Sequence, residues 1–76
     1  MPIDYIYDRH HSRSIQSCDS IEDAIYRVWA DFETREAWPI RIMTDNAQVL
    51  WQETGPMHSQ RMFKEFAKKH NVQLEE

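Results

Sequence analysis

The sequence predicts an α+β fold: a small, mainly antiparallel sheet of three to four strands with two helices packed on one face. Residues 20–35 and 56–70 carry apolar side chains at the spacing of amphipathic helices, whereas residues 38–51 alternate around a polar turn signal, as a hairpin does. The predicted element order is β-(β)-α-β-β-α. The order of the strands within the sheet does not follow from the sequence.

The chain opens with a predicted strand. Residues 3–8 alternate imperfectly and place Tyr5 and Tyr7 on one face. The polar stretch that follows is suited to a turn. After it, residues 13–17 are expected to return as a short second strand that offers Ile15 to the core.

The first helix has the clearest start signal in the chain. Either Asp19 or Ser20 can cap it, because an acid stands three positions after each of them. The helix cannot continue through Pro39, which also favours extended geometry at Trp38. Its predicted apolar stripe consists of Ile21, Ala24, Ile25, Val28, Trp29 and Phe32.

A hairpin is predicted next, with strands over residues 39–44 and 47–52. If Asp45 and Asn46 are the central turn residues, Ile42 pairs with Val49. One face of the ribbon then carries Trp38, Ile40, Ile42, Val49 and Trp51, and the other carries Arg41, Met43, Gln48, Leu50 and Gln52. The two indoles become diagonal neighbours, either as packing against a helix or with one ring exposed as a binding anchor.

The second helix is predicted over residues 56–70, with Pro56 in its first turn and Asn71 as a left-handed cap. Its apolar side is Ser59, Met62, Phe63, Phe66 and Ala67. Residues 72–76 are expected to pack back as an extended tail or to form a short edge strand.

The length predicts one domain over residues 1–76, because so short a chain cannot sustain two cores. A small core also makes a protein partner or a homo-oligomer a reasonable expectation. Cys18 is the only cysteine, and no apolar run approaches the length of a membrane span, so the expected location is the cytoplasm, with no membrane association.

Few chemical motifs are present. The sequence holds no glycine-rich phosphate loop and no usual metal-ligand spacing, so neither a cofactor nor a metal is expected. His10, His11 and Cys18 are the residues on which a metal- or thiol-dependent activity would depend. Acidic neighbours of Cys18 oppose its activation by the helix that follows.

The charge distribution is uneven. The net charge is −4, yet residues 58–70 hold four basic residues against Glu65 alone. Arg61, Lys64 and Lys68 fall on one side of the second helix, where they form an ordinary solvated face or contact an acidic protein or a nucleic acid.

These observations favour a protein that is not an enzyme: an interaction module such as an adaptor, a regulator or a small acidic inhibitor of another macromolecule. Nucleic-acid binding through the second helix is the first alternative, and the metal- or thiol-dependent activity is the second. An apolar patch is expected near Tyr26, Met43 and Leu50. The residues predicted to bind a partner are Tyr26, Arg41, Met43, Leu50, Arg61, Lys64 and Lys68.

Overall fold

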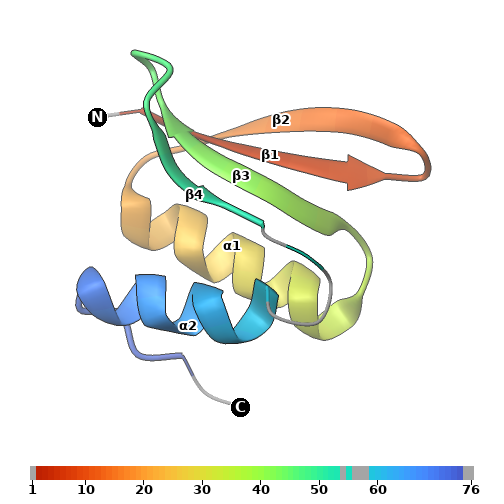
Figure 1. Cartoon of the computed structure of the whole chain (residues 1–76). Coiled ribbons are helices and arrows are strands. Elements are labelled where there is room, and N and C mark those ends of the chain that lie inside the picture. The colour runs from red at the N-terminus through yellow and green to blue at the C-terminus, as the bar shows by residue number, and fades with distance from the viewer. Residues whose placement is uncertain (1, 54, 56–58, 75–76) are drawn as a thin grey trace.

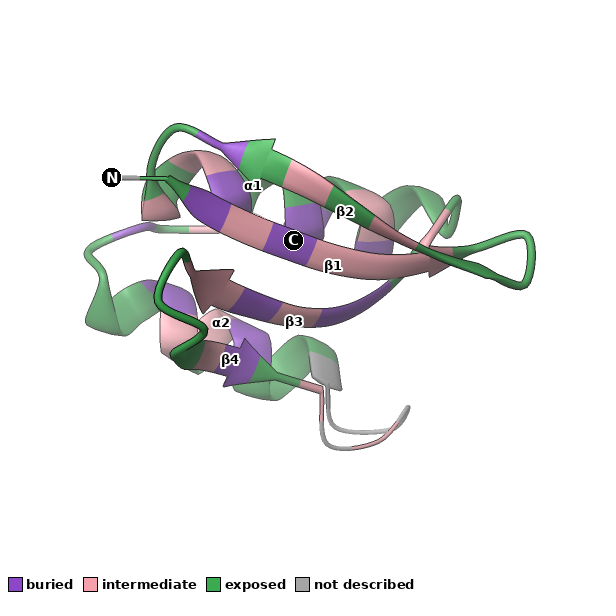
Figure 2. Cartoon of the chain, turned by 90° about the horizontal axis from the view of Figure 1, so that it is seen from above, coloured by how far each residue is buried: buried purple, intermediate pink, exposed green. Residues whose placement is uncertain are grey.

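The computed structural model describes residues 2–53, 55 and 59–74. It confirms the predicted α+β fold and the element order. The elements are β1 (Ile3–Arg9), β2 (Ser12–Cys18), α1 (Ile21–Thr34), β3 (Trp38–Thr44), β4 (Val49–Gln52) and α2 (Ser59–Lys69). The antiparallel sheet has the order β2-β1-β3-β4, and both helices lie on one side of it (Figure 1). Seen from above, α1 lies beneath β1 and β2, and α2 lies beneath β3 and β4 (Figure 2).

The short second strand predicted over residues 13–17 is present as β2 and joins β1 through a two-residue turn. His10 and His11 both have left-handed backbones, with φ of 51° and 66°, as a type I′ hairpin turn requires. The pairing places Ile15 opposite Ile6, on the face away from the helices, and Ile15 is 66% exposed. The expectation that Ile15 enters the core is therefore wrong, because the side chains of β2 that point to the helices are those at even positions.

The first helix follows its sequence pattern closely. The Ser20 side chain accepts a hydrogen bond of 3.1 Å from the Asp23 backbone N–H, so Ser20 is the cap. Its buried residues are Ala24, Ile25, Val28, Trp29 and Phe32. The helix ends at a left-handed Arg35, whose N–H donates to the Asp31 carbonyl.

The β3–β4 hairpin does not have the predicted register. The Ala47 N–H donates to the Thr44 carbonyl at 3.0 Å, and the Thr44 N–H donates to the Gln48 carbonyl at 2.9 Å. These two bonds enclose a three-residue loop in which Ala47 has a left-handed backbone with φ of 64°. The predicted two-residue turn is therefore one residue too short.

The longer loop and an irregularity after it exchange the faces of two residues. Ile42 pairs with Trp51, and Met43 pairs with Val49, so Leu50 is the extra residue between these pairs. Val49 moves to the face away from the helices, where it is 44% exposed. Leu50 instead packs against the core.

Aromatic rings fill the space between the sheet and the helices. Phe63 of α2 lies 5.0 Å from the Trp51 ring and stacks at 6.5 Å on Trp29 of α1. Phe32 meets the two hairpin indoles edge-on, at 6.2 Å from Trp51 and 5.9 Å from Trp38. The predicted diagonal contact between the indoles is replaced by these contacts with Phe32. Trp51 is buried, whereas Trp38, at the end of its strand, remains 38% exposed.

The second helix ends as the sequence predicts. Asn71 is left-handed with φ of 60°, its N–H donates to the Lys68 carbonyl, and the Val72 N–H reaches the Ala67 carbonyl at 2.9 Å. This pattern is a Schellman motif, and it buries Val72 against the core while Leu74 packs beside it. The predicted role of Pro56 lies outside the described residues.

Of the helices in the described part of the chain, none has the length and apolar character needed to cross a membrane.

Candidate functional site

The face of the sheet opposite the helices carries a mixed apolar and charged surface, which we call the outer face. The register aligns Ile15, Ile6, Arg41 and Gln52 in one row across the four strands. The neighbouring row consists of Ser17, Asp4, Met43 and Val49. Arg13 and Asp8 pair on the other side of the first row. In the described part of the chain, no segment lies over this face (Figure 1).

The charges of the outer face balance, although the whole chain is acidic. The two negative charges of Asp4 and Asp8 are balanced by the two positive charges of Arg13 and Arg41. The Arg13 Nε donates to the Asp8 carboxylate at 3.0 Å, and the Ser17 hydroxyl donates to Asp4 at 3.5 Å. Exposed pairs of this kind contribute little to stability, so they leave the surface open to rearrangement when a partner binds.

Arg41 has an unusual position within this face. Its Nε is buried and has no hydrogen-bond partner among the described residues. A buried donor without a partner is costly, and such groups call for a specific explanation. The neighbours of Arg41 across the sheet are Ile6 of β1 and Gln52 of β4, the two residues paired with it.

The structure brings together only part of the predicted partner-binding set. Arg41 and Met43 lie on the outer face, as expected, while Ile15 and Val49 join them without having been predicted there. Leu50, expected beside Met43, packs against the core instead. Tyr26 is 51% exposed but belongs to α1, on the other side of the sheet. The predicted patch of Tyr26, Met43 and Leu50 is therefore not formed.

The basic side chains of α2 lie in the helix layer, away from the outer face. The Lys64 ammonium is positioned 5.4 Å from the centre of the Trp29 ring, which attracts a cation. Lys64 is half-buried, whereas Arg61 and Lys68 are exposed. This stripe is therefore not a uniform row of solvated cations.

The residues of the thiol and metal hypothesis lie far apart. His10 and His11 form the turn at one end of β2, while Cys18 ends the same strand, roughly 20 Å away at ~3.3 Å per residue. Among the described residues, no three His, Cys, Asp or Glu side chains are grouped as metal ligands.

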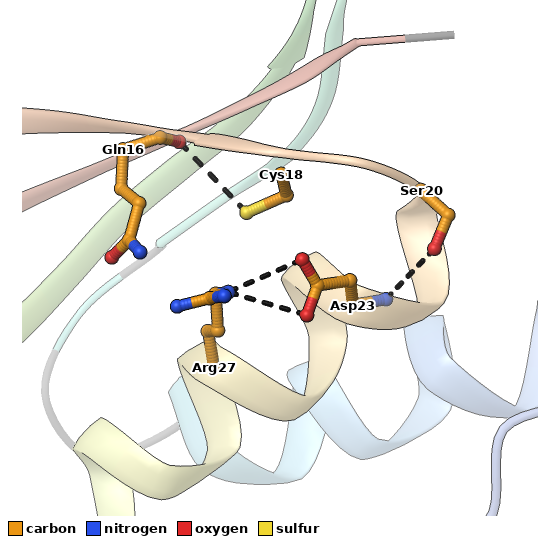
Figure 3. Close-up of polar contacts among 5 residues, drawn as sticks. All are labelled: Gln16, Cys18, Ser20, Asp23 and Arg27. Carbon is orange, nitrogen blue, oxygen red and sulfur yellow. Dashed lines mark hydrogen bonds and ion pairs between the residues drawn. The ribbon is translucent and has the colours of Figure 1, made fainter.

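Cys18 is buried, and its surroundings disfavour the reactive thiolate. Its Sγ donates to the Gln16 carbonyl at 3.8 Å, and the Asp23–Arg27 ion pair lies close by (Figure 3). Burial raises the pKa of the Cys18 thiol, the Asp23 carboxylate raises that pKa further, and Arg27 partly opposes both effects. The thiol is thus a poor nucleophile at neutral pH.

A cleft of about 480 Å³ opens where the end of β1 meets the end of α1. Its lining includes Phe32 and the partly exposed Trp38, with charged side chains of both signs around them. Two of its carboxylates already have partners, since Asp8 binds Arg13 and Asp31 binds Tyr5. Sequence reasoning missed this cleft, because it combines a turn, a helix end and a strand end that are distant in the chain.

Comparison of the chain with protein-family models, with curated proteins and with solved structures finds no match.

Proposed function

We propose that this protein is a non-enzymatic interaction module, an adaptor, regulator or inhibitor, whose partner docks on the outer face of the sheet. The observation that carries the proposal is the exposure of Ile15 on β2 and Val49 on β4, 66% and 44%, on a face that also carries Met43 and Arg41 and has no covering segment in the described chain. Antiparallel sheets with one open face usually carry polar side chains there. Apolar side chains with Met and Arg are instead typical of protein interfaces.

The size of the outer face sets the kind of complex. Strands ~4.8 Å apart with a rise of ~3.3 Å per residue give this face roughly 400–500 Å². A partner covering it buries roughly 1,000 Å² in total, at the lower end of specific interfaces. A reversible complex, suited to regulation, is therefore expected.

Nucleic-acid binding through α2 is the alternative, and it receives less support. Lys64 is held over Trp29, so it is less available to a phosphate than a solvated lysine. The overall charge of −4 also repels nucleic acid at long range.

Capture from an extract of the source cells tests the proposal. The bait is the full chain, compared with Met43→Asp on the outer face and with Tyr26→Asp as a control on α1. The proposal is supported if the unchanged chain and the Tyr26→Asp control retain a protein that Met43→Asp does not retain. Circular dichroism must show that all three baits are folded. Equal retention by all three baits, or no retained protein, contradicts the proposal.

A further inference from the structure

The two edges of the sheet differ in how they are protected. At one edge, β4 has only four residues and its pairing with β3 shifts register, two features that blunt an edge against further strands. At the other edge, β2 pairs all of its seven residues with β1 without a shift, and it contains neither proline nor lysine. Figure 2 shows β2 at the rim of the sheet, with β1 on one side and no strand of the described chain on the other. A long, regular edge of this kind is a template for another strand.

We propose that the free edge of β2 pairs antiparallel with β2 of a second copy of this chain, which joins two sheets into one of eight strands. The inference deepens the proposed function and rests on it, because it names a partner for one margin of the same surface. Two-fold symmetry with full overlap of Ser12–Cys18 places Ile15 opposite Ile15 of the second copy, since Ile15 is the central residue of the strand.

The side chains of β2 suit this symmetric register. Ile15 pairs with Ile6 within one copy, so the two copies bring four isoleucines into one row across the joined outer faces. Arg13 comes opposite Ser17 of the second copy, whose neighbour in its own sheet is Asp4. The only charge on β2 therefore meets no like charge. On the helix side, the uncharged Ser14 and Gln16 come opposite each other.

The α1 helices do not oppose this arrangement electrostatically. The side of α1 near β2 carries Asp23 and Arg27, which form an ion pair at 3.2 Å. The two charges of this pair cancel, in contrast with the chain's overall charge of −4.

Sedimentation equilibrium of the full chain, from roughly 10 μM to 1 mM, tests the dimer. We expect the mean mass to rise toward twice the chain mass. Ile15→Lys should raise the dissociation constant by about tenfold or more, because it places like charges directly opposite each other. Val49→Lys makes the same change on the other edge strand and should leave the dissociation constant unchanged.

A crosslink reports the register. In a Cys18→Ala background, Ile15→Cys should form an intermolecular disulfide, because directly opposite Cα atoms are ~4.5–5.5 Å apart. Arg13→Cys should not, since its copy lies four residues along the strand, roughly 13 Å away.

A chain that stays monomeric to about 1 mM, or an Ile15→Lys variant that dimerises as the unchanged chain does, overturns the self-pairing. So does an Arg13→Cys crosslink as fast as that of Ile15→Cys. If the chain stays monomeric while capture still depends on Met43, the proposed function stands without the dimer. If the chain dimerises through Ile15 while capture fails, the self-pairing stands and the proposed docking of another protein on the outer face is contradicted.

Discussion

The Tyr5 hydroxyl donates a hydrogen bond of 2.6 Å to the Asp31 carboxylate, which joins β1 to α1 across 26 residues. Tyr5 is almost completely buried, and Asp31 is half-buried. A hydrogen bond to an ionised acceptor contributes more than a neutral one, and its loss leaves a partly buried charge without its donor. This contact therefore fixes the position of the helix on the sheet.

Replacing Tyr5 by phenylalanine keeps the ring and removes the donor. We expect the free energy of unfolding to fall by about 2 kcal/mol in urea titration. A double-mutant cycle with Asp31→Asn isolates the pairwise contribution. A coupling energy near zero would show that the bond does not hold α1 in place.

The same contact predicts a loss of stability in alkali. Burial, and then the hydrogen bond to Asp31, raise the pKa of Tyr5 far above its ordinary value of 10.0. The contribution of protonated Tyr5 to the free energy of unfolding is present in full below the pKa of the unfolded tyrosine. It is lost as the pH rises above that value, because the unfolded tyrosine then releases a proton that the folded one retains. Above about pH 10, the unchanged chain should lose ~1.4 kcal/mol per pH unit more than Tyr5→Phe does. Parallel pH profiles for the two proteins would refute this assignment.

The periodic parts of the fold were predictable, and the contacts between distant segments were not. The stripe from Ala24 to Phe32 and the left-handed cap at Asn71 follow from local patterns, and the structure confirms them. The Tyr5–Asp31 bond could not be predicted, because Asp31 reads as a solvent-facing acid of the helix until the position of β1 is known.

The candidate site was only partly predictable for the same reason. The sequence predicts the face of Met43 correctly, but it places Val49 and Leu50 on the wrong faces of the hairpin. The loop contains a left-handed alanine where glycine is the usual signal, so the sequence offered no sign of the extra loop residue. The predicted burial of Ile15 is wrong, because an isolated apolar residue in a short strand does not reveal which face of the sheet the helices cover.

Ala47 should carry measurable backbone strain. A left-handed backbone costs a non-glycine residue roughly 1–2 kcal/mol, and glycine avoids this cost. Part of the gain is offset, because glycine has the greater conformational entropy in the unfolded chain. Ala47→Gly is therefore expected to raise the free energy of unfolding by about 0.5–1 kcal/mol. The control is Ala30→Gly on the exposed side of α1, which should lower it by about 1 kcal/mol. A loss of stability in both variants would contradict the three-residue loop.

Val28 lies at the centre of the helix stripe and is fully buried. Val28→Asp places a charge without a partner in the core and should cost more than about 4 kcal/mol, enough to unfold a domain of this size. Ala30→Asp, on the solvent side of α1, should cost only about 1 kcal/mol. Thermal melts followed at 222 nm compare the two, and similar melting temperatures would refute the stripe.

Cys18 should react slowly in the folded chain. Its burial and raised pKa predict alkylation by iodoacetamide at pH 7 that is much slower than in the urea-unfolded chain. Mass spectrometry follows the reaction. A folded-state rate above that of free cysteine would instead indicate an activated thiol.

Methyl accessibility separates the two faces of the sheet most directly. In a dilute sample, a soluble gadolinium chelate broadens the methyl NMR signals of exposed side chains. We expect strong broadening for Ile15 and Val49, whether β2 is free or paired edge to edge, and little for Ile25 and Ile42. If the Ile15 and Val49 methyls are as protected as those of Ile25, the outer face is not open, and the proposed binding surface does not exist.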